Sequence, residues 1–238
     1  MKEEFKIFND YVKQYDLRVP EIMRGFHHTY RVVNYAEYIA ESLNLSSEEI
    51  KLAKICALLH DIARFYQWTK YQTYSDLNSI DHGDMGEKIL KDGFIKKFNL
   101  DEKNENIVFD TVRLHNKFEV ESINEYTDIF VKIIRDADRL DIIENIYFAN
   151  KDKEIVIKDN LLNDIYNGKI LLNKDVITDT DIVLKCISWI NDFNYKGSFK
   201  YLKDNKILDK KIEDLGEDFK VEKLKKYIDD KFKKEGCL

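Results

Sequence analysis

The stretch Ala57-Leu58-Leu59-His60-Asp61-Ile62-Ala63-Arg64 places a histidine beside an aspartate at the end of a strongly apolar pattern. Apolar residues here and just upstream recur at spacings of three and four, which predicts a helix packed into the core. Buried ionisable groups are costly unless they are paired or bound to a cation. The two residues therefore indicate either a metal site or, as the alternative, an ordinary solvated helix end.

The composition around this stretch is that of a globular protein with one sizeable core. The chain has 238 residues, of which 44% are hydrophobic and 35% charged, so we expect a single domain spanning 1–238. It contains one proline and eight glycines, too few for the turns of a sheet-rich protein. We therefore expect an all-α fold.

The same composition disfavours several classes of protein. No run of eighteen apolar residues and no basic-then-apolar start occur, so we expect neither a membrane span nor a secretory signal. Three scattered cysteines suit a cytoplasmic location better than a disulfide framework. A net charge of −6 disfavours nucleic-acid binding but not binding of a small phosphorylated substrate. No sequence feature indicates an oligomeric state.

Amphipathic spacing predicts helices before and at the opening stretch. Residues 3–16 carry four apolar side chains on one face, and a second apolar stripe runs through residues 25–40 with His28 near its start. Ser46 and Glu49 match a capping box that would begin the helix carrying the histidine–aspartate pair.

Two later segments depart from helical spacing. Residues 65–75 are rich in aromatic side chains without a period, which predicts a loop lining a pocket or, as the alternative, a loop held by aromatic packing. Short apolar runs within 154–172 leave room for a short β-hairpin, because runs of this length fit a strand or a helix. Beyond residue 179 helical spacing returns, which predicts C-terminal helices.

All the histidines lie in the first half of the chain, and four of them border apolar helical segments. With Asp61 and the Asp136/Asp138 pair, they supply enough nitrogen and oxygen ligands for one or two divalent transition metals. This ligand chemistry suits Mn, Fe, Ni or Zn better than Ca. The histidines are His27, His28, His60, His82 and His115.

Three motifs in order resemble those of the HD-domain metal-dependent phosphohydrolases. His28-Thr29-Tyr30-Arg31-Val32 is similar to the first family element, His-x-x-Arg-Val, and Leu58–Arg64 is similar to the second, which holds the HD pair. Ala137-Asp138-Arg139-Leu140-Asp141 resembles the third. The resemblance implies an HD-domain helical bundle with its metal-binding core at about 25–145 and a C-terminal helical extension at about 150–238.

Two further motifs resemble HD proteins that hold two metals. His82–Leu90 is similar to the element His-x-x-x-Gly-x-x-x-Leu, and Leu114–Asn116 to the histidine that follows it. Neither a second histidine nor Gly-Tyr-Pro follows, so the cyclic dinucleotide phosphodiesterase subfamily is poorly supported. The resemblance implies that one metal is held by His28, His60, Asp61 and Asp138, and the second by His82, His115 and a bridging Asp61.

Some of these assignments have alternatives. His28 is preferred to His27 by its spacing to Arg31, and Asp138 to Asp136 by its spacing to Leu140. His82 and His115 have the alternative of being structural histidines at helix ends.

The resemblance also implies a reaction. A metal-activated hydroxide would hydrolyse a phosphomonoester or phosphodiester of a small metabolite or nucleotide, with Asp61 as the bridging group. Arg64, one turn past His60, is the first candidate for neutralising developing charge, followed by Lys117 and Arg139. Each has the alternative of being a surface or helix-pairing cation. No organic cofactor is expected.

Two other classes share these features. HD-domain di-iron oxygenases have the same ligand order, H, HD, H, H, D, but use dioxygen to cleave carbon bonds. A non-catalytic nucleotide-binding or sensory module is the other alternative, suggested by the aromatic residues at 65–75. The identity of the bound metal separates the oxygenase from the hydrolase.

Overall fold

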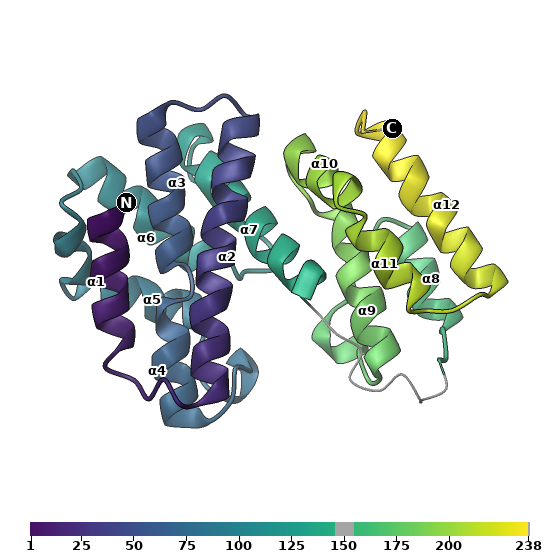
Figure 1. Cartoon of the computed structure of the whole chain (residues 1–238), viewed down its shortest axis with the longest axis horizontal. Helices are drawn as coiled ribbons and strands as arrows, with labels where there is room; N and C mark the ends of the chain where they lie inside the picture. Colours follow the sequence, from purple (N-terminus) through teal and green to yellow (C-terminus); the bar gives the residue numbers. More distant parts are fainter. Residues whose placement is uncertain (146–154, 238) are drawn as a thin grey trace. The chain divides into compact units, whose positions relative to one another are not determined.

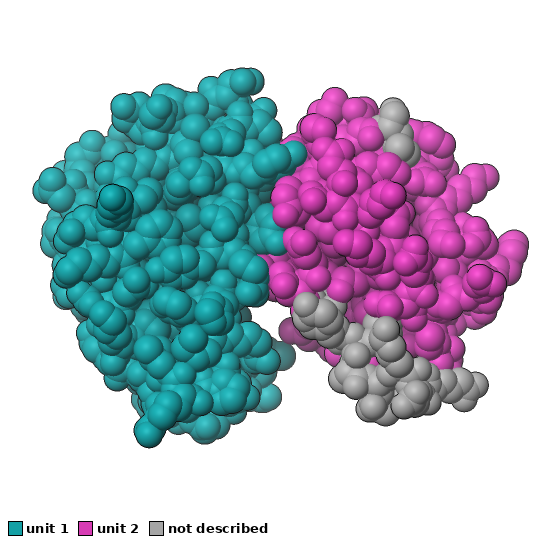
Figure 2. Space-filling view, viewed as in Figure 1, with its two compact units in different colours: residues 1–138 teal, residues 139–238 magenta. Residues whose placement is uncertain are grey.

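The computed structural model describes residues 1–145 and 155–237, and each regular element in these ranges is helical (Figure 1). The expectation of an all-α fold is confirmed. The chain divides into two compact units, 1–138 and 139–238, with the boundary inside α7 (Glu125–Asn145) (Figure 2). The single-domain organisation expected from the sequence stays a prediction.

The first unit is a helical bundle. α2 packs along α3, and the two lie side by side in Figure 1. Besides the first part of α7, the unit contains α1 (Lys2–Val12), α2 (Pro20–Ser42), α3 (Ser47–Leu59), α4 (Ile62–Tyr71), α5 (His82–Lys91) and α6 (Glu102–Leu114), with short 3-10 helices η1 (Asp76–Asn78) and η2 (Phe94–Phe98).

The helix α3 forms the centre of this bundle. Every residue from Leu52 to Leu59 except Lys54 is buried, so the helix is apolar on nearly all sides and must be surrounded. Its start is fixed by the expected capping box, in which the Ser46 side chain accepts from the Glu49 N–H and the Glu49 carboxylate accepts from the Ser46 N–H. The residue that ends it, His60, is consequently 0% exposed.

Two helices differ from the expectations. α2 begins at Pro20, which stands in the first turn where its missing N–H costs nothing, so His28 lies about two turns inside the helix rather than near its start. The predicted loop at 65–75 is wrong, because most of it belongs to α4. The buried side chains of α4 are not only aromatic ones: polar Gln67 is buried as well as Phe65, whereas Tyr66 and Trp68 are only half-buried.

The second unit is also helical. Residues 155–158 form no regular element, and α8 (Asp159–Tyr166) occupies the middle of the proposed hairpin, so the described residues 155–172 contain no strand. Leu161, Leu162 and Ile165 are buried on one face of α8, a spacing that the short apolar runs did not reveal. Residue 154 lies outside the described residues.

The C-terminal helices expected from the sequence are present. They are α8 (Asp159–Tyr166), α9 (Asp179–Ser188), α10 (Lys196–Asp204), α11 (Ile207–Glu213) and α12 (Phe219–Lys234), with 3-10 helices η3 (Asn173–Asp175) and η4 (Trp189–Asn191). None of the described helices combines the length and the apolar character needed to cross a bilayer.

Candidate metal centre

All six predicted ligands belong to the first unit and converge from its helices. Four of them lie where helices end or begin, and His28 and Asp138 lie inside α2 and α7. Helix ends suit this task, because several can meet at one point while the helices themselves pack around it. The four are His60 at the end of α3, Asp61 before α4, His82 at the start of α5 and His115 at the end of α6.

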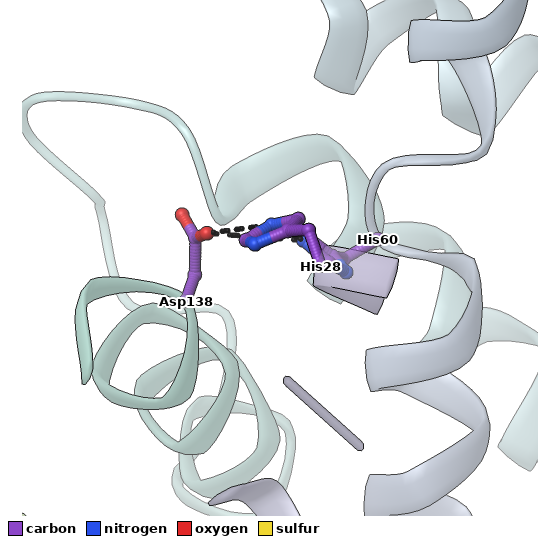
Figure 3. A group of neighbouring side chains, drawn as sticks. All are labelled: His28, His60 and Asp138. Atoms are coloured by element: carbon purple, nitrogen blue, oxygen red, sulfur yellow. Dashed lines mark hydrogen bonds and ion pairs between the residues drawn. The ribbon is translucent and has the colours of Figure 1, made fainter. Parts of the chain in front are cut away.

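His28, His60 and Asp138 form the first ligand group (Figure 3). The Nε2 atoms of the two histidines are 3.3 Å apart, and Asp138 Oδ1 lies 3.1 Å from Nε2 of His28 and 3.9 Å from Nε2 of His60. Their side chains point toward one another from three different helices (Figure 3). This spacing allows one ion to contact all three residues. The neighbouring His27 is exposed.

Asp61, His82 and His115 form the second ligand group. Nε2 of His82 lies 3.1 Å from Nε2 of His115, and Oδ1 of Asp61 lies 3.4 Å and 3.6 Å from these two nitrogens. His60 also lies close enough to share a metal with Asp61 and His115.

The carboxylate of Asp61 faces both groups at once. Its Oδ1 is directed at His82 and His115, whereas its Oδ2 lies 3.5 Å from Nε2 of His28 and 3.6 Å from Nε2 of His60. One oxygen for each group is the arrangement that a bridging carboxylate requires.

Hydrogen bonds behind the rings fix which nitrogens face the centre. Nδ1 of His60 donates to the Ala57 carbonyl, and Nδ1 of His115 donates to the Val112 carbonyl, each at 2.7 Å. Because a carbonyl only accepts, the proton of each neutral ring is on Nδ1, and its Nε2 presents a lone pair. Nitrogen lone pairs that face one another repel unless a cation lies among them, so this donor set fits a transition metal.

His82 follows the same rule with a different partner. Its Nδ1 donates to Oδ2 of Asp76 at 2.6 Å. The Nε2 atoms of His82 and His115, which approach within 3.1 Å, therefore both present lone pairs.

Burial and charge set the protonation states of the site. Burial lowers the pKa of His60 and of His82 below its ordinary value, although the Asp76 hydrogen bond opposes this shift at His82.

Burial raises the pKa of Asp138, but its hydrogen bond with His28 outweighs this and lowers that pKa to about 2. Burial also disfavours ionisation of Asp61, but the neighbouring groups, among them the charged Arg64 guanidinium, still bring its pKa well below the usual range. Neutral imidazoles and ionised carboxylates are the forms that bind metals.

The three predicted cations already have partners. Nη1 of Arg64 donates to the Tyr74 carbonyl at 2.7 Å, and its Nε makes a long 3.4 Å contact with Asp61.

Lys117 pairs with two carboxylates at the start of α5, Asp81 at 2.6 Å and Asp84 at 2.7 Å. Arg139 pairs with Asp192, which is in the second unit like Arg139 itself. Among the described contacts, only Arg64 touches a ligand.

Two residues outside the predicted set support the candidate site. Asp76 lies behind His82, as described above. Arg135, buried in α7, donates from Nη1 to the carbonyls of His115 at 3.1 Å and Lys117 at 2.5 Å. It thereby holds the end of α6 against the helix that carries Asp138. No motif marks either residue; their roles follow only from the fold.

Comparison with known proteins identifies the family of this chain. The family model described as HD domain matches residues 25–143, half of the chain, and the chain belongs to this family. The chain is 25% identical over 194 residues to ribonuclease Y of Mycoplasmoides gallisepticum. That match covers 72% of this chain but only 31% of the relative. No solved structure matches the chain significantly. The resemblance to HD-domain proteins is thus confirmed.

Proposed function

We propose that this chain is a metal-dependent phosphohydrolase acting on a phosphomonoester or phosphodiester of a small metabolite or nucleotide. The observation that carries the proposal is the placement of Asp61, with one carboxylate oxygen facing each ligand group. Membership of the HD-domain family supports it, as does the similarity to ribonuclease Y.

Each ligand group would hold one divalent ion, and Asp61 would bridge the two. Mn, Fe, Ni or Zn bound there would lower the pKa of a water and neutralise charge on a phosphoryl group. The chain's own contribution is to keep Asp61 and Asp138 ionised and His60 and His82 neutral, with the Nε2 atoms aimed inward. Asp138, whose side chain is 24% exposed, marks the side from which a phosphoryl oxygen would approach.

The predicted cations divide into two kinds. Arg64 contacts Asp61 and adds positive potential beside the bridging carboxylate. Lys117 and Arg139 bind carboxylates that are not ligands, so we assign them to helix pairing rather than to the substrate.

Metal analysis followed by a substrate screen tests this proposal. The purified protein, loaded separately with Mn, Fe, Ni or Zn, is incubated with nucleotides, phosphomonoesters, phosphodiesters and a short RNA, the last because of the ribonuclease relative. We expect release of phosphate or of an alcohol from at least one class, and chelation should stop it. A protein that holds metal yet hydrolyses no member of the panel contradicts the proposal.

The di-iron oxygenase is the second candidate, because the same six ligands in the same order serve that chemistry. It predicts that anaerobically purified protein retains iron and consumes dioxygen in the presence of a polyol or phosphonate. Dioxygen consumption with these compounds, without phosphoester hydrolysis, would replace our proposal. A sensory module would instead bind a nucleotide without turnover, a role that needs no set of six metal ligands.

A further inference from the structure

Asp76 stands directly behind one of the candidate metal ligands. It is the first residue of η1, in the segment between α4 and α5, and its Oδ2 accepts from Nδ1 of His82 at 2.6 Å. The opposite ring nitrogen, Nε2, is the atom that faces Asp61 and His115. The imidazole is therefore held between a carboxylate on one side and the candidate centre on the other.

Other side chains hold the Asp76 carboxylate in place. Oδ1 accepts from Nε2 of Gln67 at 2.9 Å and from Nη1 of Arg64 at 3.1 Å, and Oδ2 also accepts from Nδ2 of Asn116 at 3.2 Å. With His82, four donors surround one carboxylate, which satisfies its lone pairs and fixes its direction.

The segment that carries Asp76 is itself anchored from α4. Gln67, fully buried, donates to Oγ of Ser79 at 2.9 Å and to the Ile80 carbonyl at 3.1 Å. Arg64 donates to the Tyr74 carbonyl at 2.7 Å. Two polar residues of α4 thus bind the backbone or side chains on both sides of Asp76. This network accounts for the polar residue on the buried face of α4.

His82 differs in this respect from the two other ligands whose Nδ1 partners were described. His60 and His115 donate to neutral backbone carbonyls, whereas His82 donates to an anion. A carboxylate behind an imidazole fixes the tautomer and orientation of the ring and increases its basicity as a ligand.

We propose that Asp76 is a positioning residue that orients His82 and strengthens its bond to the ion of the second ligand group, with Gln67, Arg64 and Asn116 holding it. The main role of Arg64 is then to hold this carboxylate rather than to bind substrate. This inference rests on the proposed metal centre, but not on the reaction that the centre performs.

The test compares Asp76→Asn with a matched control in the full-length protein. Asp110→Asn is that control, because Asp110 also pairs with an arginine, Arg113, at 2.9 Å, and its side chain is 25% exposed against 28% for Asp76. Asp110 lies on α6, and none of its described polar contacts is to a ligand. Titration of metal-free protein with Mn²⁺ gives the stoichiometry and affinity of each ion.

We expect Asp76→Asn to lower the affinity for one of the two Mn²⁺ ions by about 10–100-fold and to leave the affinity for the other ion unchanged. Asp110→Asn should bind both as the wild type does. Wild-type affinity for both ions in Asp76→Asn, or equal weakening of both, overturns the inference.

A second measurement needs no variant. Nitrogen-15 NMR of the imidazole rings in metal-free wild-type protein should show His82 in the Nδ1-protonated form, and Nε2 protonation overturns the inference even if Asp76→Asn fails to fold. A protein that binds two ions and hydrolyses no phosphoester refutes the proposed function alone. If the protein hydrolyses a phosphoester but Asp76→Asn leaves its affinity for both ions unchanged, this inference alone is refuted.

Discussion

The two ligand groups differ in how firmly the fold holds them. In the second group, the side chains of His82 and His115 are 4% and 1% exposed, and hydrogen bonds fix both rings from behind. In the first group, His60 is held in the same way, at 0% exposure and with its Nδ1 hydrogen-bonded to the Ala57 carbonyl, but His28 is 13% and Asp138 24% exposed. Ligands that are already held in place lose less freedom when they bind an ion. We therefore expect the second group to bind its ion more tightly and the first to be the side open to substrate.

Removal of the shared carboxylate should erase this difference. Asp61→Ala takes one oxygen from each group, so we expect loss of both ions and of hydrolysis, with the helical circular dichroism retained. Metal analysis and the phosphoester assay measure the two losses. His60→Ala should give the same result, because His60 lies within reach of both groups. Hydrolysis that survives both substitutions places the active site elsewhere.

Substitutions confined to one group should separate the ions. His82→Ala should release the ion of the second group and His28→Ala that of the first, so each variant should retain one equivalent of metal. Each substitution should lower the affinity for the released ion by more than about 100-fold. That is the upper value expected when only the hydrogen-bond partner behind a ligand is removed. Mn²⁺ titration of the two variants, side by side with the wild type, measures it. If either substitution releases both ions or neither, the groups are not separable.

Removal of metal should lower the stability of the folded chain. Without a cation, Nε2 atoms that carry lone pairs lie 3.1 Å apart in the second group. An ion at about 100 times its Kd should stabilise the fold by about 2.7 kcal/mol per site. Thermal unfolding with Mn²⁺ and with a chelator measures the shift. It should be absent in Asp61→Ala, and an equal shift in that variant contradicts binding at this centre.

A smaller effect on stability is expected at the close contact between α5 and α6, beside the second ligand group. A Cβ at Gly83 would lie 2.5 Å from Oδ1 of Asn116 and 2.7 Å from the carbonyl oxygen of Arg113. The carbonyl belongs to the backbone of α6 and cannot turn aside, so Gly83→Ala should force α5 and α6 apart at a cost of about 1–3 kcal/mol. Denaturant unfolding measures this cost. Gly93→Ala is not a suitable control, because Gly93 has a positive φ at which any side chain is strained. Asp110→Asn serves as the control instead.

Much of the site follows from the sequence, because the ligands stand next to strongly periodic apolar segments. His60, His82 and His115 each lie at a helix boundary, and the order of the motifs relates them before any coordinates are known. The sequence predicts the correct helix for His28 but the wrong depth within it, because the helix starts at Pro20, ahead of its apolar stripe.

What the sequence does not reveal depends on contacts between distant segments. Asp76 lies in a segment without periodicity, and its role is visible only once the start of α5 brings His82 beside it. The partners of Arg64 and Arg139 are likewise set by packing, which helical spacing alone does not specify. Sequence patterns therefore predict the candidate ligands but not the groups that orient them.

Electron paramagnetic resonance of the protein loaded with Mn²⁺ tests the central claim most directly, since that claim is that Asp61 joins two ion sites. Two Mn²⁺ ions bridged by one carboxylate interact magnetically, so we predict two equivalents of bound ion with an exchange-coupled spectrum that is lost in Asp61→Ala. A single bound ion, or two ions with independent spectra, would contradict the account.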